Sequence, residues 1–112
     1  MVMPIAYAHR IATIDISDPT HPKEVASFAS DSTFFPHWAV ADPGSDRIVV
    51  TDQGNGQPLV KMLHFDPATG ELSWDATFKD SGATSPGVSF ARASWPNGVH
   101  GMAMPHAAVF GP

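Results

Sequence analysis

The stretch that decides the fold runs from Phe35 to Phe78 and reads FPHWAVADPGSDRIVVTDQGNGQPLVKMLHFDPATGELSWDATF. Short apolar or alternating runs, typical of β-strands, are separated in it by turns rich in Pro, Gly and Asp. Four strands joined by three turns in about 44 residues have the length of one β-propeller blade. The same pattern is also compatible with a small β-sandwich. The expected strands are residues 35–41, 47–52, 59–65 and 71–78, and the expected turns are 42–46, 53–58 and 66–70.

The residues before this stretch repeat part of its pattern. Residues 11–16 and 23–28 alternate around a Pro-containing turn, which predicts a β-hairpin. Within it, Ile14-Asp15-Ile16-Ser17-Asp18-Pro19 parallels Leu63-His64-Phe65-Asp66-Pro67, because both place an apolar–polar–apolar strand end before an Asp-Pro turn. The offset of about 49 residues is compatible with a blade repeat. This repetition favours the propeller over the sandwich.

The residues after Phe78 differ in composition. They are mostly rich in Gly, Ser and Pro, which is typical of loops. Only 105–110 has the pattern of a strand. Its first five residues, Pro105-His106-Ala107-Ala108-Val109, match Pro36-His37-Trp38-Ala39-Val40 at four of five positions. We therefore expect 105–110 to be the innermost strand of a next blade.

The predicted fold class is all-β: a partial β-propeller with one complete four-stranded blade and flanking half-blades. Residues 1–30 would be the C-terminal hairpin of a preceding blade, 31–80 the complete blade, and 81–112 the loop and inner strand of a following or closing blade. A propeller needs at least about four blades. The expected partners are thus the remaining blades of a longer parent protein or other copies of the chain. Of these we favour a truncated product, from the C-terminal end of a longer propeller.

Composition excludes several classes of partner and cofactor. The formal net charge is −5, and the 6 Lys and Arg residues are scattered, so we expect no nucleic-acid partner and no anionic membrane surface. The chain has no cysteine, which excludes disulfides, zinc–thiolate sites, Fe–S clusters and cysteine nucleophiles. Its first residues lack the basic and apolar regions of a signal peptide. The compartment stays open, and a periplasmic or secreted parent protein is compatible with the sequence.

These motifs carry a resemblance to known repeat families. Residues 36–52, with Val49-Val50-Thr51-Asp52 as the signature strand, resemble the YVTN-type propeller repeat, and 14–22 resemble the LVIVD-type repeat. The whole chain, with Trp95-Pro96-Asn97-Gly98 and Pro105-His106, resembles the C-terminal part of propellers in the selenium-binding and methanethiol-oxidase-like group. That resemblance implies copper-dependent oxidation of methanethiol or selenium binding. Because selenium binding through cysteine has no counterpart here, metal chemistry is the implication that remains.

Histidine is the residue type best suited to carry such chemistry. His37 and His106 hold the same place in two strands that would line the channel of a propeller, and His100 lies in the loop before His106. Three imidazoles can form an open copper or zinc site with a free position for substrate. The competing interpretation is structural, with each imidazole bonded to the backbone of a neighbouring blade, and the sequence leaves both open.

Two functions are therefore compatible with the sequence. The first is a fragment of a metal-dependent, copper-containing oxidase of small thiols, with metal ligands His37, His106 and His100. The alternative is a non-enzymatic propeller module that binds a protein or small ligand through its loops. No catalytic residue can be assigned, since the Asp residues lie at strand ends and turns, where they cap backbone N–H groups. We expect the tryptophans, Trp38, Trp74 and Trp95, to lie between sheets of adjacent blades. We expect His64 to be a packed or surface residue of a strand, and His9 and His21 to be solvated loop residues.

Overall fold

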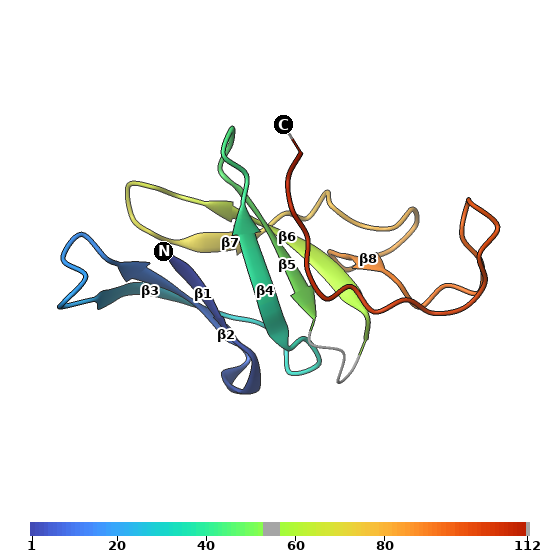
Figure 1. The fold of residues 1–112 in the computed structure, drawn as a ribbon, viewed down its shortest axis with the longest axis horizontal. Helices are drawn as coiled ribbons and strands as arrows, with labels where there is room; N and C mark the ends of the chain where they lie inside the picture. Colours follow the sequence, from blue (N-terminus) through green and yellow to red (C-terminus); the bar gives the residue numbers. More distant parts are fainter. Residues whose placement is uncertain (53–56, 112) are drawn as a thin grey trace.

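The computed structural model of the protein describes residues 1–52 and 57–111. Within them the chain forms two antiparallel β-sheets and a single 3₁₀ turn, Ala6–Ala8, which confirms the all-β fold class (Figure 1). Residues 53–56 of the turn expected at 53–58 lie outside the described residues. Neither sheet is closed on itself.

The two sheets follow each other along the chain. The three-stranded sheet has the order β1-β2-β3, and the five-stranded sheet has the order β4-β5-β6-β7, with β8 paired to β6 beyond the end of β7. The strands of the first are β1 (Val2–Ile5), β2 (Arg10–Asp15) and β3 (Lys23–Ala29). The strands of the second are β4 (Pro36–Ala41), β5 (Arg47–Asp52), β6 (Leu59–Phe65), β7 (Leu72–Trp74) and β8 (Val88–Ser89).

Most of the predicted strands are confirmed, with three differences besides residues 105–110. β1 was not predicted, because it is short and contains Pro4, a residue that strands accept mainly at a sheet edge. β7 ends at Trp74 instead of Phe78, because the Asp75 carboxylate accepts the N–H groups of Thr77 and Phe78 and so forms a turn. The two-residue β8 was also missed.

The strand predicted at 105–110 is wrong. The backbone of these residues pairs with no strand in the described part of the chain. Side chains hold it instead: the Thr51 hydroxyl donates to the carbonyl of His106 at 3.0 Å, and the indole N–H of Trp38 donates to the carbonyl of Ala108 at 3.2 Å. We call residues 102–111 the tail. Figure 1 shows the tail crossing the five-stranded sheet.

The core lies between the two sheets. β1 packs against β4 and β3 packs against β7, so the sheets face each other with their strands in the same order. The side chains of Ile11, Val50 and Leu63 are completely buried there. The opposite face of the five-stranded sheet holds a second, smaller cluster around Val49 and its neighbours, which the tail partly covers. β5 is buried on both faces as a result, which explains its continuous apolar run.

The connection between the sheets, residues 30–35, supplies the centre of this interface. Phe34 is fully buried, and its ring meets the Trp74 ring edge-on at 5.7 Å, while Phe28 of β3 meets the same ring at 5.0 Å. The Lys61 ammonium lies 4.7 Å from the centres of both the Phe34 and Trp74 rings. Trp74 thus lies between two sheets as predicted. Trp38 is 43% exposed, and the Trp95 ring lies against Phe90 with the ring centres 5.3 Å apart, so for these two the prediction is not tested.

Lys61 also forms the ion pair that fixes this connection. Its ammonium donates to a carboxylate oxygen of Asp31 at 2.8 Å. Partial burial acts to raise the pKa of Asp31, but hydrogen bonds from Lys61 and Thr33 outweigh it and lower the pKa to about 2. A carboxyl with a lowered pKa stabilises the folded state above its ordinary pKa and loses that contribution as the pH falls.

We predict that Lys61→Met flattens the acid limb of the stability profile. Asp31 is about half exposed, so the ion pair contributes no more than about 1 kcal/mol at neutral pH after screening. The difference in unfolding free energy between the unaltered chain and Lys61→Met should therefore shrink as the pH falls from about 4 toward 2. Urea unfolding at several pH values measures it, with Lys79→Met as the matched control, because Lys79 is exposed. A wild-type advantage that stays constant down to pH 2 would contradict this account.

Candidate functional site

Two of the three predicted metal ligands lie side by side. His37 and His106 are 69 residues apart in sequence, yet their Nε2 atoms are 3.3 Å apart and their ring centres 4.8 Å apart. His37 lies at a β-bulge, because the pairing of β4 with β5 skips from Pro36–Asp52 to Trp38–Thr51. A bulge redirects the side chain of the extra residue. Here the bulged residue is the one whose imidazole meets the tail.

The end of β5 holds both histidines in place. Thr51, fully buried, donates its hydroxyl to the His106 carbonyl and so fixes the tail. The next residue, Asp52, accepts the backbone N–H of Phe35 at 3.0 Å and so fixes the start of β4. Consecutive side chains of one strand therefore position the two segments that carry His37 and His106. These are the last two residues of the Val-Val-Thr-Asp motif.

The geometry of the pair permits two kinds of chemistry. Two neutral imidazoles can share one proton if one Nε2 donates and the other accepts. Alternatively, both Nε2 atoms can bind one metal ion: metal–nitrogen bonds of about 2.0–2.1 Å in a tetrahedral site place two ligand nitrogens about 3.3–3.4 Å apart. The observed separation of 3.3 Å is compatible with either.

The third predicted ligand, His100, is not brought to the pair. It is exposed and forms an isolated bridge with Ser94, in a turn closed by the Trp95 N–H bonding to the Val99 carbonyl. Within residues 1–52 and 57–111, no group of three or more His, Cys, Asp or Glu side chains is arranged to hold a metal ion. The described chain therefore offers two neighbouring imidazoles.

A cluster of one histidine and two aspartates was not predicted. The His64 ring lies between two carboxylates, with Nδ1 2.9 Å from Asp46 and Nε2 3.4 Å from Asp75. The pKa of Asp75 is lowered, chiefly by the Thr77 hydroxyl and backbone N–H. No short motif in the sequence signals this contact, because its three members come from separate strands and turns. His21, as predicted, is exposed, with its ring bonded to Asp18.

His9 differs from its prediction as a solvated loop residue. It is half-buried, adopts a left-handed backbone conformation with φ of 48°, and ends the 3₁₀ turn. Its Nδ1 lies 3.2 Å from the Phe34 carbonyl, and its ring packs against Phe35 with the ring centres 4.3 Å apart and the planes tilted by 57°. This imidazole therefore contacts the connection between the sheets, residues 30–35, and helps to hold it in place.

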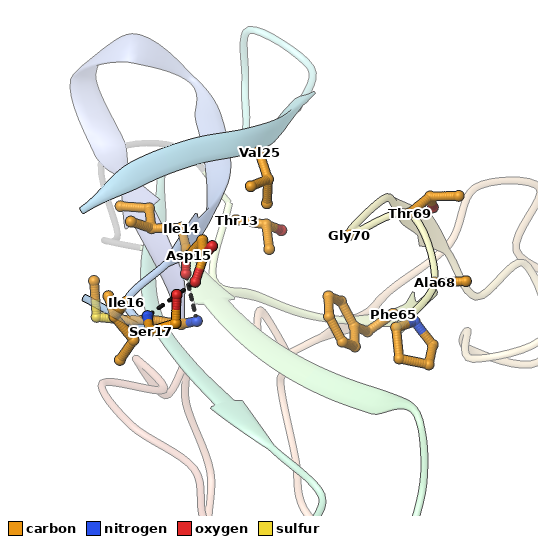
Figure 2. Close-up of a pocket in the computed structure, with 12 residues that line it drawn as sticks. Thr13, Ile14, Asp15, Ile16, Ser17, Val25, Phe65, Ala68, Thr69 and Gly70 are labelled. Carbon is orange, nitrogen blue, oxygen red and sulfur yellow. Dashed lines mark hydrogen bonds between the residues drawn. The ribbon is translucent and has the colours of Figure 1, made fainter. Parts of the chain in front are cut away.

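A groove of about 490 Å³ lies apart from the histidine pair, between the three-stranded sheet and the β6–β7 turn (Figure 2). Figure 2 shows Asp15 and Ser17 on one side of it and Phe65 and Ala68 on the other. Hydrogen bonds from Ser17 lower the pKa of the Asp15 carboxyl. The described lining residues include no histidine. The groove and the imidazole pair are therefore separate features.

Comparison of the chain with protein-family models, with curated proteins and with solved structures gives no match. In the described part of the chain, no helix has the length and apolar character needed to cross a membrane. The resemblance to YVTN-type and LVIVD-type repeats therefore rests on the sequence motifs alone.

We predict that Thr51→Val loosens the tail. The substitution keeps the side-chain shape but removes the donor to the His106 carbonyl, so it should cost about 1 kcal/mol of stability and speed amide exchange in residues 105–110. Thr13→Val is the matched control: Thr13 is also buried, but its hydroxyl finds no hydrogen-bond partner among the described residues. That control should be neutral or stabilising. Hydrogen exchange and urea unfolding measure both, and equal effects of the two variants would contradict the assignment.

Proposed function

We propose that the chain is part of a β-propeller in which the His37–His106 pair binds a transition-metal ion, with copper as the metal and a small thiol as the substrate of the complete protein. The observation that carries this proposal is the 3.3 Å separation of the two Nε2 atoms, which suits two ligands of one ion. Copper and the thiol come from the resemblance of the motifs to the methanethiol-oxidase-like group.

The arrangement of the sheets supports the propeller. Each sheet is an antiparallel meander, and the connection at 30–35 leads from the last strand of the first sheet, β3, to the first strand of the second, β4. β1 packs against β4 and β3 packs against β7, so the inner edges of the two sheets lie together and so do their outer edges. Successive blades of a propeller are related in this way, with the chain passing from the outer strand of one to the inner strand of the next.

The histidine pair fits part of a metal site. A catalytic site of this kind has about three protein ligands and an open position, and the pair supplies two imidazoles. The third ligand would come from the remaining blades of a parent protein or from another copy. Copper supplies a soft centre that favours thiolate sulfur. The residues of this chain would hold the ion, and the bulge at His37 and the Thr51 hydroxyl would fix the distance between its ligands.

The second candidate is a non-enzymatic binding module, and the groove in Figure 2 favours it. This hollow combines a carboxylate, hydroxyls and the Phe65 ring, a mixture of polar and apolar groups typical of ligand sites. In that case the His37–His106 contact would be a hydrogen bond that holds the tail. The two candidates differ in whether the pair binds a metal ion.

Metal titration tests the proposal. We predict that Cu(I) or Zn(II) binds the chain at one site, and that His37→Ala and His106→Ala each weaken binding at least 10-fold, because a single imidazole remains. His21→Ala is the matched control, an exposed histidine in a turn. Native mass spectrometry and calorimetry measure stoichiometry and affinity. Unchanged metal content in both His37→Ala and His106→Ala would reject the metal site and favour the binding module.

His100→Ala separates the pair from the three-histidine site expected from sequence. Because the structure keeps His100 on a separate turn, its loss should leave the affinity unchanged. If a metal-loaded sample forms, consumption of a small thiol in air then tests the reaction, with the His37→Ala protein as the blank.

A further inference from the structure

The three-stranded sheet has a free edge at β1. Met1 and Ile14 exchange backbone hydrogen bonds at 2.8 Å in both directions, so they form a hydrogen-bonded pair of the antiparallel ladder. Because such pairs alternate along a strand, the backbone groups of Val2 and Pro4 point away from β2. No other strand pairs with this side of β1 in the described chain. The edge offers the Val2 N–H and the carbonyls of Val2 and Pro4.

Residues 105–110 of the tail have the sequence of a strand but pair with no sheet in the described chain. Residues 105–109 repeat the sequence of 36–40, which begins the innermost strand, β4. The tail lies on the face of the five-stranded sheet that is turned away from β1–β3, where Ala108 and Phe110 pack on the second apolar cluster. Val109 beside them is 83% exposed.

Exposed apolar side chains gather at the same two places. In the described residues, most large exposed hydrophobic side chains belong either to the tail and the loop before it or to β1 and the residues at its two ends. Exposed apolar side chains on both segments would be covered if the two segments paired. The first set is Val99, Met102, Met104 and Val109, and the second is Met1, Met3 and Tyr7.

We propose that β1 of one copy of this chain pairs with residues 105–110 of a second copy. The three-stranded sheet of one copy lacks one inner strand, and the tail of the other is an inner strand without a sheet. Joining them gives a four-stranded sheet, (105–110)-β1-β2-β3, equivalent to β4-β5-β6-β7. The matching sequences of the tail and β4, together with the matching number of strands, favour a second copy as the partner.

The contact joins two different surfaces, so it is head-to-tail and can close into a ring. Each copy would contribute two four-stranded units, and two to four copies would then give about four to eight blades, the range known for propellers. His106 of one unit and His37 of the next would alternate around the ring. The inference rests on the propeller arrangement proposed above and is independent of metal binding.

The test is the mass of the untagged chain by native mass spectrometry and light scattering, in EDTA and over a wide concentration range. We expect a discrete assembly of two to four copies of the 11.9 kDa chain. Val2→Pro removes the one amide donor on the free edge without removing a bond between β1 and β2, so it should raise the concentration needed for assembly at least 10-fold. Val2→Ala is its control, since it trims the side chain but keeps the amide.

A second variant changes the other surface. Val109→Asp places a charge on the tail at an exposed position, where it costs little folding stability, and should dissociate the assembly as Val2→Pro does; Ala68→Asp in the exposed β6–β7 turn is its control. A monomer at all concentrations, or an assembly that survives both Val2→Pro and Val109→Asp, would overturn the proposal. Because the measurement is made in EDTA, its failure leaves the metal site standing, and loss of metal binding in His37→Ala leaves the assembly standing.

Discussion

The structure depends on the contact between Phe34 and Trp74. Phe34 comes from the short connection between the sheets, and it is fully buried where their faces meet. The rings of Phe28 and Phe34 both form T-shaped contacts with Trp74. One indole on β7 therefore contacts both β3 and the connection at 30–35. The Lys61 ammonium over these rings and its ion pair with Asp31 fix the same connection from the polar side. This contact covers the apolar faces of both sheets at one side of the interface, where Phe34 joins the same core as Ile11 and Leu63.

The position of the histidine pair follows from that packing. Burial of β5 on both faces fixes its direction, and its last two residues then hold the segments on either side: Asp52 the start of β4, and Thr51 the tail. A buried hydroxyl that has a partner stabilises a structure, whereas one without a partner costs free energy. Thr51 and Thr13 show both cases in one chain, and the partnered one lies at the candidate site. The position of the candidate site therefore depends on the packing of β5 in the interior.

The sequence predicts the strands whose residues alternate or cluster, such as β2 and β5, because burial imposes that pattern. It fails where a single side chain overrides the pattern: Asp75 ends β7 early by capping Thr77 and Phe78. The repeated Pro-His step singled out His37 and His106, and the structure brings their Nε2 atoms to 3.3 Å, although the strand predicted around His106 does not form. It could not exclude His100, since nearness in sequence says nothing about the separate turn around Trp95. Asp46, His64 and Asp75 meet only through strand pairing, which leaves no local signal.

The tail takes part both in the proposed metal site and in the proposed assembly. Its weak attachment to the rest of the chain explains how it can do both. The tail is attached to the rest of the chain by side-chain hydrogen bonds from Thr51 and Trp38, the His37–His106 contact, one backbone bond from Ala103 to Phe90 and a few apolar contacts. This is a modest set for ten residues that have lost their conformational freedom. A strand paired along β1 of another copy would gain backbone hydrogen bonds and cover Val109. Pairing would then also add backbone restraints on His106, whose carbonyl already accepts a hydrogen bond from Thr51. Assembly would in this way restrict the geometry of the imidazole pair.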